Sequence, residues 1–271
     1  MRQATSLQSD LFGITRELGT GIAGWLASWW RVFHFGALAL VMALSRATYD
    51  KENRAVTAKQ IYFTAWQVLP WFTLLAALLS MVLIRIVVAT SLSYGLSQYA
   101  LEMVVRVLVL ELIPLFAALF VALRSGAAIN TEVALMHIRG DFQAMQRAGA
   151  DPLRRELVPR VIGSAVSVVA LTVVSCVIAL VLAYIGIYGF SPWGLAGYTR
   201  TVGSVFDLQI TIGLALKTLL FGLAVAVIPI TSSLEMPREV RLAPVAVLRG
   251  MVRLFLVLVM VEGASLAVKY I

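Results

Sequence analysis

Two ionisable residues, Glu111 and Lys217, lie inside stretches that are otherwise apolar enough to cross a membrane. A charge at such a depth is costly, so it usually faces the protein interior or a water-filled cavity and marks a functional site. Glu111 follows Glu102 by nine positions, and Lys217 follows Gln209 by eight. At about 1.5 Å per residue, both charges lie roughly 12–14 Å below the same membrane boundary. We therefore expect a structural ion pair between two helices or a polar patch in a substrate cavity.

The composition indicates an all-α polytopic membrane protein. Of the 271 residues, 61% are hydrophobic and only 13% are charged, whereas a soluble domain carries about 25% charged residues. At about 20 residues per span, this length holds about five or six helices in one domain. The net charge of +8 fits basic residues that flank spans on the cytoplasmic side and contact anionic lipid. We expect no nucleic-acid partner.

The first long apolar stretch, residues 21–44, differs from the later ones. Arg31 and His34 lie at its centre beside three tryptophans, and tryptophan prefers the membrane interface. We therefore expect an in-plane amphipathic helix, with a genuine first span as the alternative. Residues 1–59 would form the cytoplasmic-side N-terminus, in which a basic linker follows this helix and no cleavable signal peptide is expected. The permease-like domain would cover residues 60–271.

Five transmembrane helices are expected after the linker. Basic loops alternate with uncharged or nearly uncharged ones, which places the N-terminus in the cytoplasm and the C-terminus outside. The predicted spans are residues 62–90, 103–123, 161–190, 209–232 and 251–271.

The second span continues as a polar helix to about residue 138. Small and polar residues there fall within roughly a 120° arc of one helical face. Such a face either contacts another helix or lines a lumen, or it is an ordinary solvated helix end. Its members include Arg124, Ser125, Thr131 and Glu132.

A charged elbow follows at about residues 140–152. Its short amphipathic pattern predicts a helix that inserts an apolar side into a groove on a partner, or one that packs on its own membrane domain. The residues that we assign to this contact are Asp141, Phe142, Met145, Arg147, Asp151 and Pro152.

Several chemistries have no motif in this sequence. There is no G-x-x-x-x-G-K-[ST] phosphate loop, no G-x-S-x-G and no H-E-x-x-H. The single cysteine, Cys176, lies in an apolar run, and the two histidines are far apart. We expect no metal site and no enzymatic activity in this chain.

Taken together, the motifs resemble the MlaE/YrbE family, the permease subunits of ABC transporters that work with lipid-carrying MCE-domain proteins. The family pattern runs E-L-G-P, a basic residue before G-[ST]-A, A-E-[LI]-G-x-M, V-D-P and V/I-x-P-R. The corresponding segments keep their spacing and read ELIP at 111–114, RSGAA at 124–128, TEVALM at 131–136, ADP at 150–152 and LVPR at 157–160.

Two departures from the family pattern concern candidate sites. Leu110 stands where relatives often carry arginine, and Arg106, one turn away, is a candidate replacement on the same cavity. The elbow has lost acidic residues, which indicates a dedicated ATPase partner.

The resemblance implies a lipid-transporting permease in the bacterial inner membrane. Two copies would enclose a phospholipid cavity above Glu111 and Lys217, and the elbow would couple to a cytoplasmic ABC ATPase dimer that binds ATP and Mg²⁺. A periplasmic MCE hexamer would continue the lipid path, with a small STAS-type accessory subunit as a further partner. The alternatives are a permease for a sterol or hydrocarbon, a secondary carrier, and a membrane anchor without transport activity.

Overall fold

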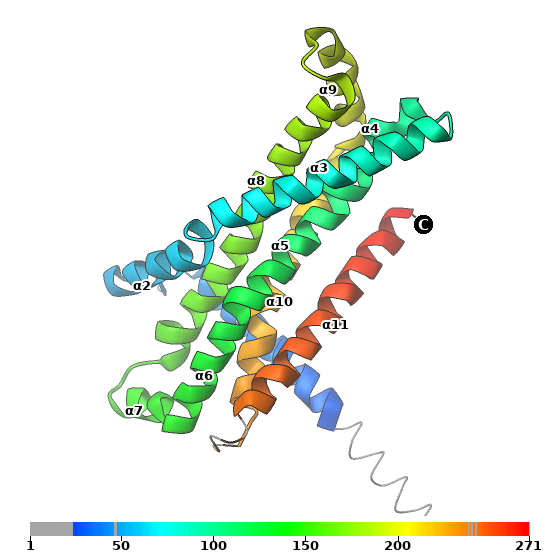
Figure 1. Cartoon of the computed structure of the whole chain (residues 1–271). Coiled ribbons are helices and arrows are strands. Elements are labelled where there is room, and N and C mark those ends of the chain that lie inside the picture. The colour runs from blue at the N-terminus through cyan, green and yellow to red at the C-terminus, as the bar shows by residue number, and fades with distance from the viewer. Residues whose placement is uncertain (1–23, 46–47, 238, 240, 242, 271) are drawn as a thin grey trace, which may run out of the picture.

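The computed structural model describes residues 24–45, 48–237, 239, 241 and 243–270, and these residues form no β-strand. Figure 1 shows a bundle of long, tilted helices. Their bounds are α2 Lys51–Ile61, α3 Leu69–Ser93, α4 Ala100–Met103, α5 Ile113–Val121, α6 Ala127–Arg139, α7 Asp141–Arg147, α8 Val158–Tyr188, α9 Leu195–Val205, α10 Leu208–Leu234 and α11 Ala243–Tyr270.

Six helical stretches among the described residues are long and apolar enough to cross a membrane. The all-α multi-pass prediction is therefore confirmed. These stretches are Gly24–Leu44, Asn53–Ser93, Ser97–Arg139, Leu153–Tyr188, Leu208–Leu234 and Val247–Lys269.

The stretch Gly24–Leu44, called here the N-terminal helix, differs from the other five in direction. In Figure 1 it runs behind α10 and α11 and crosses their direction rather than following it. Its length and hydropathy alone would allow it to span, so the in-plane placement stays a prediction. The predicted linker after it is partly helical, because Lys51–Ile61 forms α2.

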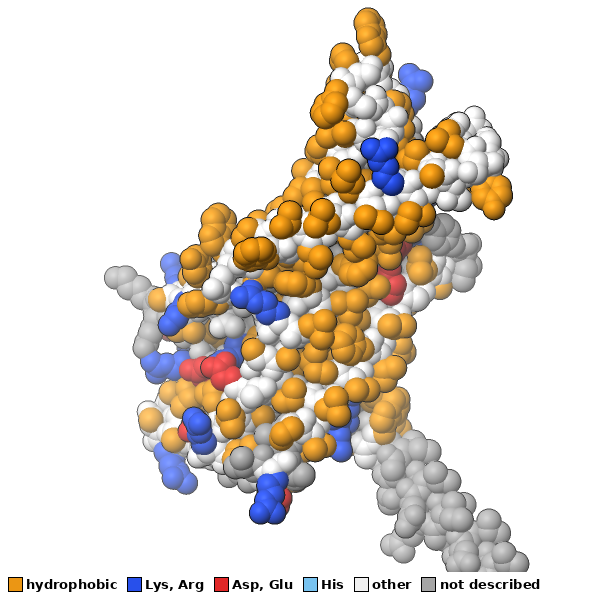
Figure 2. Space-filling model, viewed as in Figure 1, with side chains coloured by type: hydrophobic (Ala, Val, Ile, Leu, Met, Phe, Trp, Pro, Cys, Tyr) orange, Lys and Arg blue, Asp and Glu red, His pale blue; other side chains and the backbone are white. Residues whose placement is uncertain are grey.

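The two ends of the bundle differ in character. We call them the α7 end and the α9 end after the short helices that lie there (Figure 1). On the face drawn in Figure 2, hydrophobic side chains cover the middle of the molecule, and most of the Lys and Arg side chains lie toward the α7 end. An apolar belt with a basic end is the pattern expected of a protein that spans a membrane.

In the part of the chain that the structure describes, four π-helical segments interrupt the α-helices, at Tyr62–Trp66, Val104–Leu112, Ala122–Gly126 and Leu153–Leu157. Three of them precede a proline by a few residues, at Pro70, Pro114 and Pro159. Proline has no backbone N–H, and its ring clashes with the carbonyl four residues earlier. Wider i→i−5 turns relieve that clash and turn the following side chains by an extra residue.

The core forms where α10 packs against α8 and α6. A Cβ atom placed on Gly222 would lie 2.7 Å from the Ala165 Cα, so the two helices meet backbone to backbone. Gly126 similarly faces the Val225 carbonyl, which has no helical N–H partner four residues later because that residue is Pro229. Close backbone contacts of this kind fix how α10 presents Lys217.

Candidate functional site

Glu111 lies near the end of the π-helical segment Val104–Leu112, three residues before Pro114. Its side chain is only 11% exposed and is held from two directions. One carboxylate oxygen accepts a hydrogen bond from Lys217 on α10, and the other accepts from Lys269 on α11 at 2.7 Å. The structure thus brings Glu111 and Lys217 into direct contact.

Lys217 is the most deeply buried charge of this group, with a side chain 3% exposed. It lies on α10, whose first turn begins at Asp207, where the side chain accepts a hydrogen bond from the Leu208 N–H at 2.7 Å. The Lys217 ammonium also lies 3.2 Å from a carboxylate oxygen of Glu262 on α11. A buried ammonium is tolerable only with such partners, because its desolvation penalty is several kcal/mol.

Four residues therefore form one charged cluster, Glu111, Lys217, Glu262 and Lys269. Sequence reasoning missed Glu262 and Lys269, although both lie in the predicted last span. The signal was the same as for Glu111, an ionisable residue inside an apolar stretch. With all four members ionised, the formal charge of the cluster is zero.

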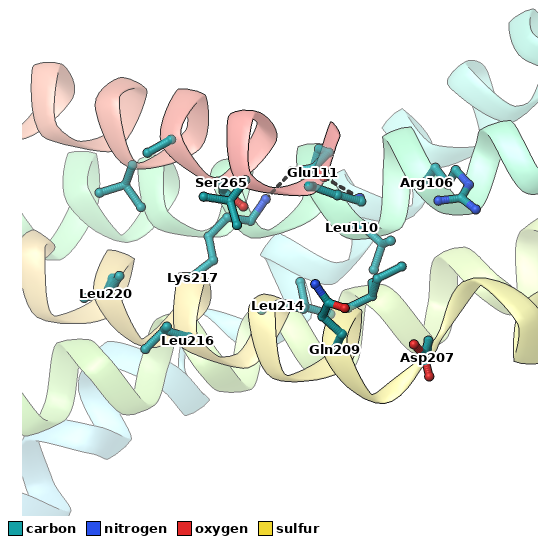
Figure 3. A pocket seen from close by; sticks show the side chains of 16 residues that line it. Arg106, Leu110, Glu111, Asp207, Gln209, Leu214, Leu216, Lys217, Leu220 and Ser265 are labelled. Carbon is teal, nitrogen blue, oxygen red and sulfur yellow. Dashed lines mark hydrogen bonds and ion pairs between the residues drawn. The ribbon is translucent and has the colours of Figure 1, made fainter. Parts of the chain in front are cut away.

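A cavity of about 510 Å³ lies beside this cluster. Figure 3 shows Lys217 directed toward Glu111, with Arg106 and Asp207 farther along and Leu216 and Leu220 on the other side. The four predicted cavity residues, Arg106, Leu110, Glu111 and Lys217, all line it. The complete lining is Arg106, Leu110, Glu111, Asp207, Gln209, Ile210, Gly213, Leu214, Leu216, Lys217, Leu220, Val261, Ala264, Ser265, Val268 and Lys269.

The cavity is amphipathic, and its apolar wall continues onto the surface of the protein. Leu216 is 56% exposed and Val268 is 80% exposed, although both line the cavity. Arg106 at the polar side is paired with Glu102 at 2.8 Å. A ligand with a charged group and an apolar body could therefore enter sideways from the membrane.

The predicted polar face of α6 does not line this cavity. Arg124, Thr131 and Glu132 are exposed and Ser125 is half-buried. The buried face of the helix is formed instead by Ile129, Asn130, Val133 and Ala134. Within one chain the predicted face is thus largely open, and its role in contacting another helix or lining a lumen stays a prediction.

The motif residue Glu132 has a partner on another helix. It lies 3.1 Å from the guanidinium of Arg160 near the start of α8, which also bonds Glu156 at 2.6 Å. Two of the segments that carry the family resemblance therefore meet in space and tie α6 to α8.

The predicted elbow contains α7, enclosed by two turns with glycine in the left-handed region, Gly140 and Gly149. Phe142 is buried in the core of its own domain, and Pro152 is buried as well. The other predicted contact residues are more accessible: Asp141 and Met145 are half-buried, and Arg147 and Asp151 are exposed. The elbow thus both packs on the membrane domain and presents a polar surface.

A second polar cluster fastens the N-terminal helix to the α7 end. Glu235, just after α10, accepts hydrogen bonds from Ser28 at 2.7 Å, from Arg31 at 2.9 Å and from Arg253 at 3.1 Å. Burial by itself raises the pKa of the Glu235 carboxyl, but these three donors outweigh it and hold the pKa below its ordinary value.

The comparison with known families gives a match over most of this chain. Residues 57–267 match the permease MlaE family. The chain belongs to the MlaE permease family. This MlaE-family chain is also similar to proteins described as probable ABC transporter permease proteins, in Rickettsia prowazekii (30% identical), Rickettsia typhi (31%) and Rickettsia felis (29%).

Each of these three similarities covers 140 residues, which is 49% of this chain and 54% of the relative. The chain therefore spans about half the length of the curated relatives it matches. The family match describes residues 57–267 as a permease.

Proposed function

We propose that this chain is the membrane subunit of an ATP-driven transporter that moves phospholipid between the bacterial inner membrane and a periplasmic MCE protein. The observation that carries this proposal is the amphipathic cavity beside the charged cluster. A phospholipid has the same division, with a charged headgroup next to apolar chains. A hydrocarbon would leave the cluster without a polar ligand group.

The dimensions and the opening of the cavity support a lipid cargo. A volume of about 510 Å³ lies within the usual range of about 300–1,000 Å³ for small-molecule sites. It suits a headgroup and the first part of the acyl chains. The exposed apolar residues at its edge, Leu216 and Val268, would let the rest of the chains stay in contact with the bilayer.

The position of the basic residues gives the proposed orientation. The α7 end carries the exposed residues Arg139, Arg147 and Arg155, and positive residues favour the cytoplasmic side. An ABC ATPase dimer, which would bind ATP and Mg²⁺, would then contact the accessible side of the elbow, including Asp141, Met145, Arg147 and Asp151. Phe142 and Pro152 would hold the elbow to the membrane domain from within.

The remaining proposed partners are those that the family resemblance implies. A second copy of this chain would face the open side of α6, and an MCE hexamer would sit at the α9 end on the periplasmic side. A small STAS-type subunit would accompany the ATPase. In this arrangement, ATP-driven closure of the two copies would move lipid through the cavity between the membrane and the MCE protein.

The decisive experiment is purification of the chain from its native membrane in mild detergent, with mass spectrometry of proteins and bound lipids. We expect an ABC ATPase, an MCE-domain protein and phospholipid, and ATP-dependent lipid transfer after reconstitution. Sterol or hydrocarbon in place of phospholipid would contradict the cargo. If neither an ATPase nor an MCE protein co-purifies and transport is driven by an ion gradient, the whole proposal is contradicted.

A further inference from the structure

The last helix, α11, contributes two of the four residues of the charged cluster. Glu262 and Lys269 lie seven residues apart on α11, which is about two helical turns and therefore the same face. Glu262 lies against Lys217, and Lys269 lies against Glu111. The two charges of α11 thus have opposite sign and different neighbours, so they need not have the same role.

Lys217 is the fixed member of the cluster. Its ammonium lies between two carboxylates, Glu111 and Glu262, and its side chain is 3% exposed. Moving it would leave two buried carboxylates without this cation, which is strongly unfavourable. Lys217 therefore holds the site together and is a poor candidate for releasing a partner to a ligand.

The bond between Lys269 and Glu111 is better placed than the bonds of Lys217 to be replaced by bonds to a ligand. Both residues line the cavity, and Lys269 approaches one carboxylate oxygen of Glu111 while Lys217 occupies the other. Breaking this bond therefore leaves Glu111 paired with Lys217. The lysine side chain has a flexible four-carbon stem, so its ammonium can turn toward a group inside the cavity.

We infer that the cavity selects a zwitterionic phospholipid headgroup, whose phosphate binds Lys269 and whose ammonium binds the oxygen of Glu111 that Lys269 leaves. This inference rests on the proposed lipid transport and names its preferred substrate class. The exchange replaces the bond between Lys269 and Glu111 by one bond from each of these residues to the headgroup. An anionic headgroup lacks the ammonium and would place its phosphate beside a carboxylate, which is unfavourable in a desolvated site.

The test measures headgroup selection by the intact permease with the partners that co-purify with it. The complex is placed in nanodiscs of equimolar phosphatidylethanolamine and phosphatidylglycerol with identical acyl chains, and lipids retained after release into detergent are quantified by native mass spectrometry. We expect retained phosphatidylethanolamine to exceed phosphatidylglycerol roughly tenfold, as when one charge-assisted hydrogen bond distinguishes two ligands.

Two variants should change the ratio of retained phosphatidylethanolamine to phosphatidylglycerol in different ways. Glu111→Gln removes the negative charge that would bind the ligand ammonium and would repel an anionic headgroup, so the ratio should reverse in favour of phosphatidylglycerol. Lys269→Gln removes the phosphate partner, so retention of both lipids should fall while phosphatidylethanolamine remains preferred. Arg154→Gln is the matched control, because Arg154 is also an ion-paired basic residue, with Asp50 as its partner, but does not line the cavity, and its ratio should stay at the wild-type value.

The possible outcomes separate this inference from the proposed function. Equal retention of the two lipids, or a ratio that Glu111→Gln leaves unchanged, would overturn the inference while ATP-dependent lipid transfer still supports the permease. Equal losses of both lipids in all three variants would show a structural role and would likewise overturn it. Retention of no phospholipid at all would refute both proposals.

Discussion

The Cys176 thiol on α8 lies 3.5 Å from the carbonyl oxygen of Val109. In the i→i−5 turns of the segment Val104–Leu112, that carbonyl would accept from residue 114, which is a proline without an N–H. The thiol therefore donates to an oxygen that the proline deprives of its backbone partner. The lone cysteine, which lies in an apolar run of the sequence, thus supports the helix turn that carries Glu111.

Substitutions at Cys176 should separate this hydrogen bond from simple packing. Cys176→Ser keeps a donor of similar size and should leave the thermal unfolding midpoint in detergent close to that of wild type. Cys176→Ala removes the donor and should destabilise the protein by about 1–3 kcal/mol, the usual cost of leaving a buried acceptor unsatisfied. If serine proved more harmful than alanine, packing and not the hydrogen bond would explain the residue.

Gly222 should tolerate no side chain, because α8 and α10 meet there backbone to backbone. The added Cβ of Gly222→Ala would lie 2.7 Å from the Ala165 Cα and 3.0 Å from its carbonyl oxygen, and neither atom can rotate away. Overpacking of this kind costs about 1–3 kcal/mol, so the unfolding midpoint should fall.

Gly213→Ala on the same helix provides the control for this prediction, since nothing lies within 4 Å of its added Cβ. It should leave stability unchanged or raise it slightly, because alanine is the better helix former. Equal unfolding midpoints for the two alanine variants would contradict the close contact of α8 and α10.

The sequence predicts the spans better than it predicts which side chains meet. The length of the apolar stretches locates the membrane-spanning helices. The equal depth expected for Glu111 and Lys217 in the membrane predicts that they lie close together. Helical faces drawn with a constant 3.6-residue period fail across π-helical turns, because each such turn shifts the following side chains by one residue.

Glu262 and Lys269 were missed for a different reason. Their partners, Lys217 and Glu111, are distant in sequence, and only the packing of α11 against α10 and α5 makes the pairs visible. A charged residue in an apolar stretch indicates that a partner is needed, but the sequence does not identify that partner.

The ion pair of Arg160 with Glu132 should matter unequally to its two members. The Arg160 side chain is 9% exposed and also bonds the Glu156 carboxylate and backbone carbonyl. Arg160→Gln should therefore cost about 1.5–3 kcal/mol or more, since it removes several hydrogen bonds to a charged group. The Glu132 side chain is 59% exposed, so Glu132→Gln should cost about 0–1 kcal/mol. Thermal unfolding of the two variants tests this order, and a larger loss for Glu132→Gln would contradict it.

Glu235 should make attachment of the N-terminal helix sensitive to acid. Although burial opposes ionisation of this carboxyl, the hydrogen bonds from Ser28, Arg31 and Arg253 lower its pKa below the ordinary value of 4.5. A carboxyl with a lowered pKa in the folded state stabilises that state above its unfolded pKa, and the contribution disappears as pH falls through the lowered pKa. Wild type should therefore lose this contribution below pH 4.5.

The measurement compares unfolding midpoints of wild type and Glu235→Gln from about pH 7 to about pH 3. Glutamine cannot ionise, so the advantage of wild type should be constant near neutral pH and should vanish in acid. Added salt should reduce the part contributed by Arg31, whose side chain is 56% exposed. An advantage that stays constant down to the lowest pH would show that the Glu235 charge does not fasten the N-terminal helix.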